Sequence, residues 1–426
     1  MDLKNSKTLL KKALKSIPLA SQTFSKSYKQ YPDGFPYFAD NGKGGKIKDI
    51  DNNEFVDLIM GLLPMTLGYN DKDVNTAIIN QLKKGITFSL PTILEQKLSD
   101  KLVKLIPSAE KVRFAKNGTD ATSGAIRLAR GVNKKDKIIT CGYHGWQDWY
   151  IGTTSRNLGV PKKVRKLSIA AKFNDIDNVH KIIKKNKDEI SAMIIEPMSF
   201  VEPKKDYYKE LKYLLKKNKI LMIFDEVITG FRFSLGGAQQ YFNIVPDLSC
   251  FGKGMANGMP LSALVGKKKY MNKMSEIFFS GTFGGESLSL AASIATIDKI
   301  KREKVIDKLW KSGSVIMEHV NKEIKNYNLS EFVKIMGKEP WTLINFSNFR
   351  NINKFELKYI FMKNMAANGV LTLGTNNVCY AHTQKDINKI KQAYSNTLKL
   401  ISEIVFENRR YNYKSIKPIF SVRKND

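Results

Sequence analysis

The residues with the clearest chemical potential are a pair of acids at the end of an apolar segment and a lysine further along. Ile220–Phe224 is apolar and is followed by Asp225 and Glu226, and Lys253 comes 28 residues after Asp225, between two glycines. The small neighbours allow a bulky planar group to approach the backbone. A lysine in an apolar place is a nucleophilic amine suited to a Schiff base. Together, these residues indicate a lysine that holds an aldehyde cofactor and a carboxylate that keeps its ring nitrogen protonated.

Other interpretations of the same residues stay open at this point. An apolar strand that ends in two acids is also typical of the Mg²⁺-binding strand of a P-loop ATPase. That interpretation requires an upstream GxxxxGK[ST] loop, and the sequence contains none. The acids can also be a structural pair at a strand end, and Lys253 can be an ordinary surface lysine in a turn.

The composition is that of a globular enzyme with an unusual charge. Of the 426 residues, 42% are hydrophobic and 26% are charged, which excludes disordered and fibrous proteins. The net charge of +31 raises the question of nucleic-acid binding, but only 11 of the 71 basic residues are Arg. Because Arg reads phosphates and bases better than Lys, we interpret the charge as a solvated lysine coat and expect no nucleic-acid partner.

The sequence predicts neither a metal site nor a membrane-spanning segment. Cys141, Cys250 and Cys379 are far apart, and the four histidines form no HExxH motif, so we expect no metal. No apolar run approaches the ~18 residues that span a bilayer. The first 17 residues predict an amphipathic helix without a secretory core or cleavage site. A cytoplasmic protein without a membrane partner is therefore expected.

The hydrophobic pattern alternates between helical and strand periods, which predicts an α/β fold. Residues 46–59 predict a hairpin, and the stretch from 290 to 324 is helical. The other predicted helices cover residues 95–106, 118–130, 175–186, 207–217, 356–368 and 386–406. The predicted strands cover residues 137–141, 192–195, 220–224, 248–251, 263–265, 333–335, 342–346 and 370–373. We expect an N-terminal helix and hairpin segment (1–60), a large domain (61–305), a small C-terminal α/β domain (306–406) and a basic tail (407–426).

At this level the sequence resembles the class III pyridoxal-phosphate aminotransferases, particularly the glutamate-1-semialdehyde 2,1-aminomutase branch. The resemblance covers nearly the whole chain, and five ordered motifs at family-like spacing make it specific. These motifs are Asp225-Glu226-Val227 with Thr229-Gly230-Phe231-Arg232, Phe251-Gly252-Lys253-Gly254, Asn117-Gly118-Thr119-Asp120-Ala121, Tyr143-His144-Gly145 and Gly281-Thr282. The resemblance implies fold type I, with a large mixed sheet, helices on both faces and a smaller C-terminal α/β domain.

The resemblance also implies pyridoxal 5′-phosphate as the cofactor. Lys253 is expected to hold it covalently and to move the proton during catalysis, and Asp225 to pair with the ring nitrogen. Gly118 and Thr119, at the start of a helix, are expected to bind its phosphate. Tyr143 is expected to stack on one face of the cofactor ring.

Two more positions complete the cofactor site that the resemblance implies. Val227 is expected to pack on the other face of the ring. Thr282 resembles a residue that reaches the phosphate in the neighbouring subunit, so we expect a homodimer with shared active sites. Glu196 and Arg232 are expected to have structural roles, and His144 to shape the loop beside the ring.

Three departures from the aminomutase pattern affect the expected substrate. Lys26 stands at the matching position of an N-terminal Arg that recognises a carboxylate, the stretch 370–382 contains no Glu, and the loop through Ser199 and Phe200 is shortened. Asn376 and Asn377 instead offer groups suited to hydroxyls. We expect an aminotransferase that moves an amino group from a donor to the carbonyl of a small, polar, sugar-like acceptor. The alternative is the aminomutase itself, which isomerises glutamate-1-semialdehyde to 5-aminolevulinate.

Overall fold

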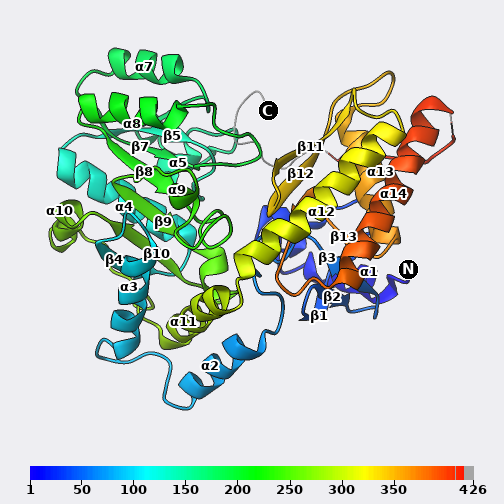
Figure 1. Cartoon of the computed structure of the whole chain (residues 1–426), viewed down its shortest axis with the longest axis horizontal. Helices are drawn as coiled ribbons and strands as arrows, with labels where there is room; N and C mark the ends of the chain where they lie inside the picture. The colour runs from blue at the N-terminus through cyan, green and yellow to red at the C-terminus, as the bar shows by residue number, and fades with distance from the viewer. Residues whose placement is uncertain (408, 417–426) are drawn as a thin grey trace. The chain divides into compact units, whose positions relative to one another are not determined.

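The computed structural model describes residues 1–407 and 409–416 and divides into two compact units (Figure 1). One unit comprises Lys72–Ile306, and the other joins Met1–Asp71 to the described residues from Asp307 onward. The N-terminal and C-terminal segments share a unit because strand β13 pairs in parallel with β3. This grouping differs from the four consecutive parts expected from the sequence. Most of the expected tail, residues 408 and 417–426, lies outside the described residues.

A seven-stranded mixed sheet forms the centre of the Lys72–Ile306 unit, in the order β4-β10-β9-β8-β7-β5-β6. Strand β10 is antiparallel to both its neighbours, and the pairs from β9 to β6 are parallel. The strands are β4 (Lys111–Ala115), β5 (Lys137–Cys141), β6 (Ser168–Ala170), β7 (Ile190–Ile195), β8 (Leu221–Asp225), β9 (Leu248–Phe251) and β10 (Ser262–Gly266).

Helices cover both faces of this sheet, as Figure 1 shows for α4 on one face and for α7 and α8 on the other. Successive strand residues point to opposite faces, so Ile138 packs in the core under α4 and Ile139 in the core under α7 and α8. The helices of the unit are α2 (Lys72–Leu82), α3 (Ile93–Leu105), α4 (Gly118–Asn133), α5 (Asp148–Ile151), α6 (Lys162–Arg165), α7 (Ile176–Lys185), α8 (Tyr207–Lys217), α9 (Ala238–Tyr241), α10 (Lys268–Met271) and α11 (Ser287–Arg302). The expected large mixed sheet with helices on both faces is confirmed.

The other unit is built on two smaller sheets, β1-β2-β3-β13 and β11-β12-β14. The predicted hairpin is present as β2 and β3, which pair antiparallel. The elements are α1 (Lys4–Ala13), β1 (Ala39–Lys43), β2 (Lys46–Asp49), β3 (Glu54–Asp57), most of α12 (Val305–Asn326), β11 (Val333–Lys338), β12 (Trp341–Phe346), α13 (Lys354–Ala367), β13 (Val370–Leu371), β14 (Thr375–Asn377) and α14 (Gln384–Phe406). The expected smaller α/β part is therefore also present.

Two of the predicted helical stretches differ from the structure. The single helical stretch expected from about 290 to 324 is two helices, α11 and α12, because Lys304 adopts a left-handed backbone (φ 48°) between them. The N-terminal helix covers Lys4–Ala13 rather than all of residues 1–17, and a turn follows it. Both differences concern the residues where a helix ends. The local backbone geometry determines where a helix ends, and the hydrophobic period does not show it.

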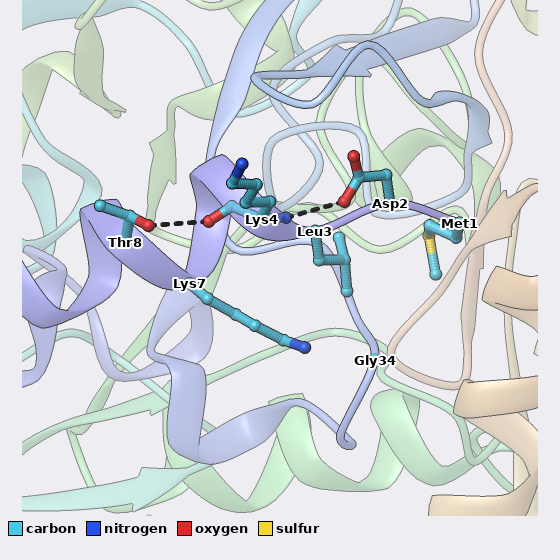
Figure 2. Close-up of a pocket in the computed structure, with 7 residues that line it drawn as sticks. All are labelled: Met1, Asp2, Leu3, Lys4, Lys7, Thr8 and Gly34. Carbon is cyan, nitrogen blue, oxygen red and sulfur yellow. Dashed lines mark hydrogen bonds between the residues drawn. The ribbon is translucent and has the colours of Figure 1, made fainter.

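A hollow of about 600 Å³ lies beside α1 at the N-terminus (Figure 2). Three of its lining residues, Asp2, Lys4 and Thr8, bond to one another within the same segment. The Thr8 hydroxyl donates to the Lys4 carbonyl (2.9 Å), and the Lys4 N–H donates to Asp2 (3.0 Å). We therefore assign it no functional role. None of the described helices is long and apolar enough to cross a membrane, and the described residues contain no cluster of metal-ligating side chains.

Candidate active site

The two residues with the strongest chemical signal come together at one edge of the seven-stranded sheet. Asp225 is the last residue of β8, and Lys253 follows the end of β9 by two residues. These strands are parallel neighbours, with Asp225 paired in register with Cys250. Because the carboxyl ends of parallel strands meet at the same edge, ligands of α/β proteins bind there. The sequence-predicted acid and lysine therefore lie in one site.

The lysine has a constrained backbone and a shifted pKa. Lys253 has φ 43°, in the left-handed region that non-glycine residues rarely adopt, and such strain is concentrated at functional sites. Burial lowers the pKa of its amine, and the positive charge of Arg232 lowers it further. The negative charges of Glu196 and Asp225 raise this pKa and partly offset the burial. A lowered pKa makes the neutral, nucleophilic amine more accessible near neutral pH.

Asp225 is held in place by two contacts. One carboxylate oxygen bonds with His144 Nδ1 (2.9 Å), and the other accepts the Val227 N–H (3.2 Å). Asp225 is 6% exposed and His144 is 1% exposed, so their interaction is buried. The sequence placed His144 near the site but did not indicate this direct contact with the acid. His144 thus fixes the orientation of the carboxylate.

The start of helix α4 lies against the Asp225 segment. Asn117 and Asp120 form a capping box, in which the Asp120 carboxylate accepts the Asn117 N–H (2.7 Å). A Cβ atom at Gly118 would lie only 2.9 Å from Val227 Cγ1, so glycine is required for this close approach. The free N–H groups of a first helical turn, with the Thr119 hydroxyl beside them, are suited to bind an anion.

The loop with Tyr143 connects these parts. The backbone N–H of Tyr143 donates to Glu196 (2.9 Å), and the Thr122 hydroxyl donates to the His144 carbonyl (2.9 Å). Gly145 has φ +103°, and a side chain there would overlap the Thr119 hydroxyl. Tyr143 is 43% exposed, and its ring meets the Tyr150 ring edge-on, with ring centroids 5.6 Å apart.

Sequence reasoning assigned Glu196 a structural role and gave no reason to place it near the lysine. It follows the last residue of β7, beside β8 in the sheet. Burial, and then the negative charge of Asp225, raise the pKa of Glu196 to about 7, whereas His144 and Lys253 lower it. The signal in the sequence was an acid directly after an apolar strand, the same pattern that marks Asp225.

Thr282 is in a different part of the same unit. It is exposed and lines a hollow of about 910 Å³ together with Lys116, Phe88 and Phe283. Lys253, Asp225 and Tyr143 take no part in lining that hollow. The structure thus brings six of the predicted site residues together, namely Lys253, Asp225, Val227, Gly118, Thr119 and Tyr143. Thr282 is not among them, although its hollow also includes Asp120 of the first turn of α4.

The two asparagines expected to face a substrate are engaged inside their own unit. Asn376 is 1% exposed, its amide donates to Thr342 (2.9 Å) and its oxygen accepts the Tyr394 hydroxyl (2.8 Å). Asn377 is 3% exposed and donates to the Ile59 carbonyl (2.8 Å). Asn376 is therefore not available to bind hydroxyl groups, and the expectation of a sugar-like substrate loses this support.

Comparison with known proteins decides the family. The family model for class III aminotransferases matches residues 27–396. The chain belongs to the class III aminotransferase family. Its relatives include a 3-aminobutyryl-CoA aminotransferase from Cloacimonas acidaminovorans, 33% identical over 95% of this chain and 99% of that protein. A glutamate-1-semialdehyde 2,1-aminomutase from Methanosarcina acetivorans is 35% identical over 93% and 99% of the two chains.

Solved structures agree with the fold of this aminotransferase. The internal aldimine form, with PLP, of the FumI protein of Sphingopyxis sp. MTA144 superposes with a TM-score of 0.88 at 25% identity and covers 94% of this chain and 97% of its own. A transaminase with PLP bound has the same TM-score at 19% identity, with coverage of 95% and 99%. The expected fold type I architecture is confirmed.

Next to Asp225, this aminotransferase contains another buried acid. Glu226 is fully buried, and its carboxylate accepts hydrogen bonds from the Thr229 hydroxyl (2.5 Å) and the N–H groups of Ala238 (2.6 Å) and Gln239 (2.8 Å). Gln239 in turn donates to Ser249 of β9 (3.1 Å). These bonds connect the end of β8 to α9 and to the strand that precedes Lys253.

We predict that Glu226→Gln removes part of the pH dependence of stability. Burial raises the pKa of Glu226 from 4.5 to about 6. The folded state therefore holds a proton that the unfolded state releases, and stability falls as the pH rises from about 4.5 through 6. The full difference is about 2 kcal/mol. Denaturant unfolding between pH 4.5 and 7.5 should show a steeper fall for the wild type than for the variant. Equal pH slopes would contradict the prediction. Glu202→Gln, at an exposed position, is the control.

Proposed function

We propose that this aminotransferase uses pyridoxal 5′-phosphate and moves an amino group from a donor to the carbonyl of a small polar acceptor. The observation that carries the proposal is the placement of Lys253 and Asp225 at adjacent parallel strand ends. The electrostatics fit as well, because one group is an amine with a lowered pKa and the other a buried carboxylate held by a histidine. The relatives with aminotransferase and aminomutase names support the same chemistry.

The residues of the site fit this cofactor. Its aldehyde suits the amine of Lys253, and its ring nitrogen suits the carboxylate of Asp225. Its phosphate suits the first turn of α4. There, Gly118 has no side chain because a Cβ atom would clash with Val227, and the Thr119 hydroxyl lies beside the backbone N–H groups. When bound, the cofactor supplies an electron sink that stabilises negative charge on the substrate carbon.

The chain's own residues then have separate tasks. His144 and the Val227 N–H orient the Asp225 carboxylate, so its charge is directed at one position. Lys253 Nζ is the group that accepts and returns the proton of the substrate carbon, which its lowered pKa favours. Tyr143 covers one side of the site and Val227 the other, which excludes water from the reacting atoms.

We further propose that two copies share their active sites. Thr282 is exposed and lines a hollow in which Lys253 takes no part, and an exposed position fits a residue that serves a second copy. Large apolar side chains line the same hollow and are exposed, including Phe88 (47%), Leu90 (76%) and Phe283 (58%). Exposed apolar groups at this density are typical of a surface that another subunit covers.

The second candidate function is glutamate-1-semialdehyde 2,1-aminomutase, favoured by relatives of that name at 33–37% identity. Against it, Lys26 replaces the expected Arg, and a lysine lacks the planar fork that grips a carboxylate through two hydrogen bonds. Orientation matters most when the amino group and the carbonyl must exchange within one bound molecule. For this reason, we favour transfer from an external donor.

The first prediction is that the cofactor is attached to Lys253. Borohydride reduction of the purified protein, followed by peptide mass mapping, should find the modification on this lysine, and Lys253→Ala should abolish it. Lys267→Ala is the matched control, since Lys267 is also at a strand end but pairs with Asp247 (2.7 Å). A modification on another lysine would falsify the assignment.

The second prediction is that inactive subunits complement one another. Lys253→Ala and Thr282→Ala affect different copies' contributions to each shared site. After subunit exchange in an equal mixture, about a quarter of the sites should be intact, because half of the dimers are mixed and each has one good site. Activity should therefore rise above that of either variant alone. No recovery after verified exchange would count against a shared site.

The third prediction separates the two candidate reactions. The protein in its pyridoxamine-phosphate form, supplied with glutamate-1-semialdehyde, should produce 5-aminolevulinate poorly and should require an external amino donor for repeated turnover. Lys26→Arg restores the planar cation and serves as the matched variant, in which 5-aminolevulinate formation should rise. Efficient multiple turnover by the wild type without any donor would instead establish the aminomutase.

A further inference from the structure

Glu196 makes hydrogen bonds with both its backbone and its side chain at the edge of the sheet where Asp225 and Lys253 lie. Its own N–H donates to the Cys141 carbonyl (3.0 Å), and its carboxylate accepts the N–H of Tyr143 (2.9 Å). These two bonds attach the loop after β5 to the end of β7. The position of the Tyr143 backbone thus depends directly on the Glu196 side chain.

The loop is shaped to admit this carboxylate. Gly142 has φ +118°, and a Cβ atom there would lie 2.5 Å from Glu196 Oε2 and 2.8 Å from Cγ. The left-handed backbone and the missing side chain at this position are both needed for the contact. Glycine at position 142 therefore has a specific reason, which is the close approach of Glu196.

The surroundings of Glu196 are charged on several sides. Asp225 at the end of β8 is the second carboxylate of the cluster and raises the pKa of Glu196, whereas His144 and Lys253 lower it through their charges. The phenols of Tyr143 and Tyr150 are also within its electrostatic reach. Arg232 acts on Lys253 from a buried position, with 1% exposure. Because the pKa of Glu196 is about 7, the Lys253 amine lies in the field of two ionised carboxylates above neutral pH, rather than one.

We propose that Glu196 is a positioning residue of the cofactor site, which holds the Tyr143 loop in place and supports a positive charge on the Lys253 nitrogen. The inference rests on the proposed function, because it assumes that Lys253 is the residue that holds the cofactor. Two effects follow that separate it from an ordinary structural acid. If only the negative charge of Glu196 is removed, the protonation of the Lys253 nitrogen changes. If the oxygen that accepts the Tyr143 N–H is removed as well, the loop also loses a hydrogen bond that holds it.

The test compares Glu196→Gln and Glu196→Ala with the wild type, all loaded with pyridoxal 5′-phosphate. Gln keeps an oxygen for the Tyr143 N–H and removes the charge, whereas Ala removes both. Glu202→Gln is the matched control, since Glu202 is also followed by proline but is exposed. Two quantities are measured: the midpoint pH at which the absorbance of the bound cofactor changes, and the dissociation constant of the cofactor.

We expect the midpoint pH to fall by about one unit in Glu196→Gln, because the protonated nitrogen loses a nearby opposite charge. The cofactor should bind to this variant much as to the wild type. Glu196→Ala should show the same fall and bind the cofactor about tenfold more weakly, the effect of one lost hydrogen bond. Glu202→Gln should match the wild type in both measurements.

The outcomes are distinguishable. A midpoint in Glu196→Gln equal to that of Glu202→Gln overturns the electrostatic role, and undiminished cofactor binding in Glu196→Ala overturns the role in holding the loop. If Glu196→Ala does not fold, Gly142→Ala takes its place in the loop test, since it disturbs the same contact while the carboxylate remains. Failure of the proposed function appears earlier, as a wild-type protein with no cofactor on Lys253.

Discussion

The parallel pairing of β8 with β9 is the constraint on which the rest of the site depends. It places the end of one strand, with Asp225, beside the end of the next, which leads to Lys253. Strands β5 and β7 deliver the Tyr143 loop and Glu196 to the same edge in the same way. The fold therefore brings the residues of the candidate site together from strand ends, and the strand pairing keeps those ends in register.

The sequence predicted the parts of the molecule that follow simple periodic rules. Strands buried on both faces, such as β5 and β9, were predicted with their correct bounds because they are short apolar runs between turns. Helix α8 was predicted from its apolar face in the same way. Lys253 and Asp225 could be predicted from the sequence because of the residues beside them: Asp225 follows an apolar run, and Lys253 lies between two glycines. In the structure, Asp225 ends β8 and Lys253 follows the end of the neighbouring parallel strand β9.

Other features depend on contacts between distant segments and left no local signal. The bond between His144 and Asp225 joins residues 81 positions apart, and the role of Asn376 is set by Thr342 and Tyr394. Asn376 was expected to bind a substrate because an amide suits hydroxyl groups. In the structure it is buried and bonds with Thr342 and Tyr394 instead. Strand β14 is three residues long and is formed by pairing with β12, so no hydrophobic period indicates it.

The four hydrogen bonds that Glu226 accepts, together with those that fix Asp225, leave the active-site edge with little freedom of its own. In the reaction that we propose, a proton leaves one carbon and returns to another, so the group that carries it has to move. Under that proposal, the four methylene groups of Lys253 supply the movement, next to two carboxylates that hydrogen bonds hold in place. A shorter amine at position 253 would keep the chemistry of nitrogen but lose its reach, so chain length at this position is as important as basicity.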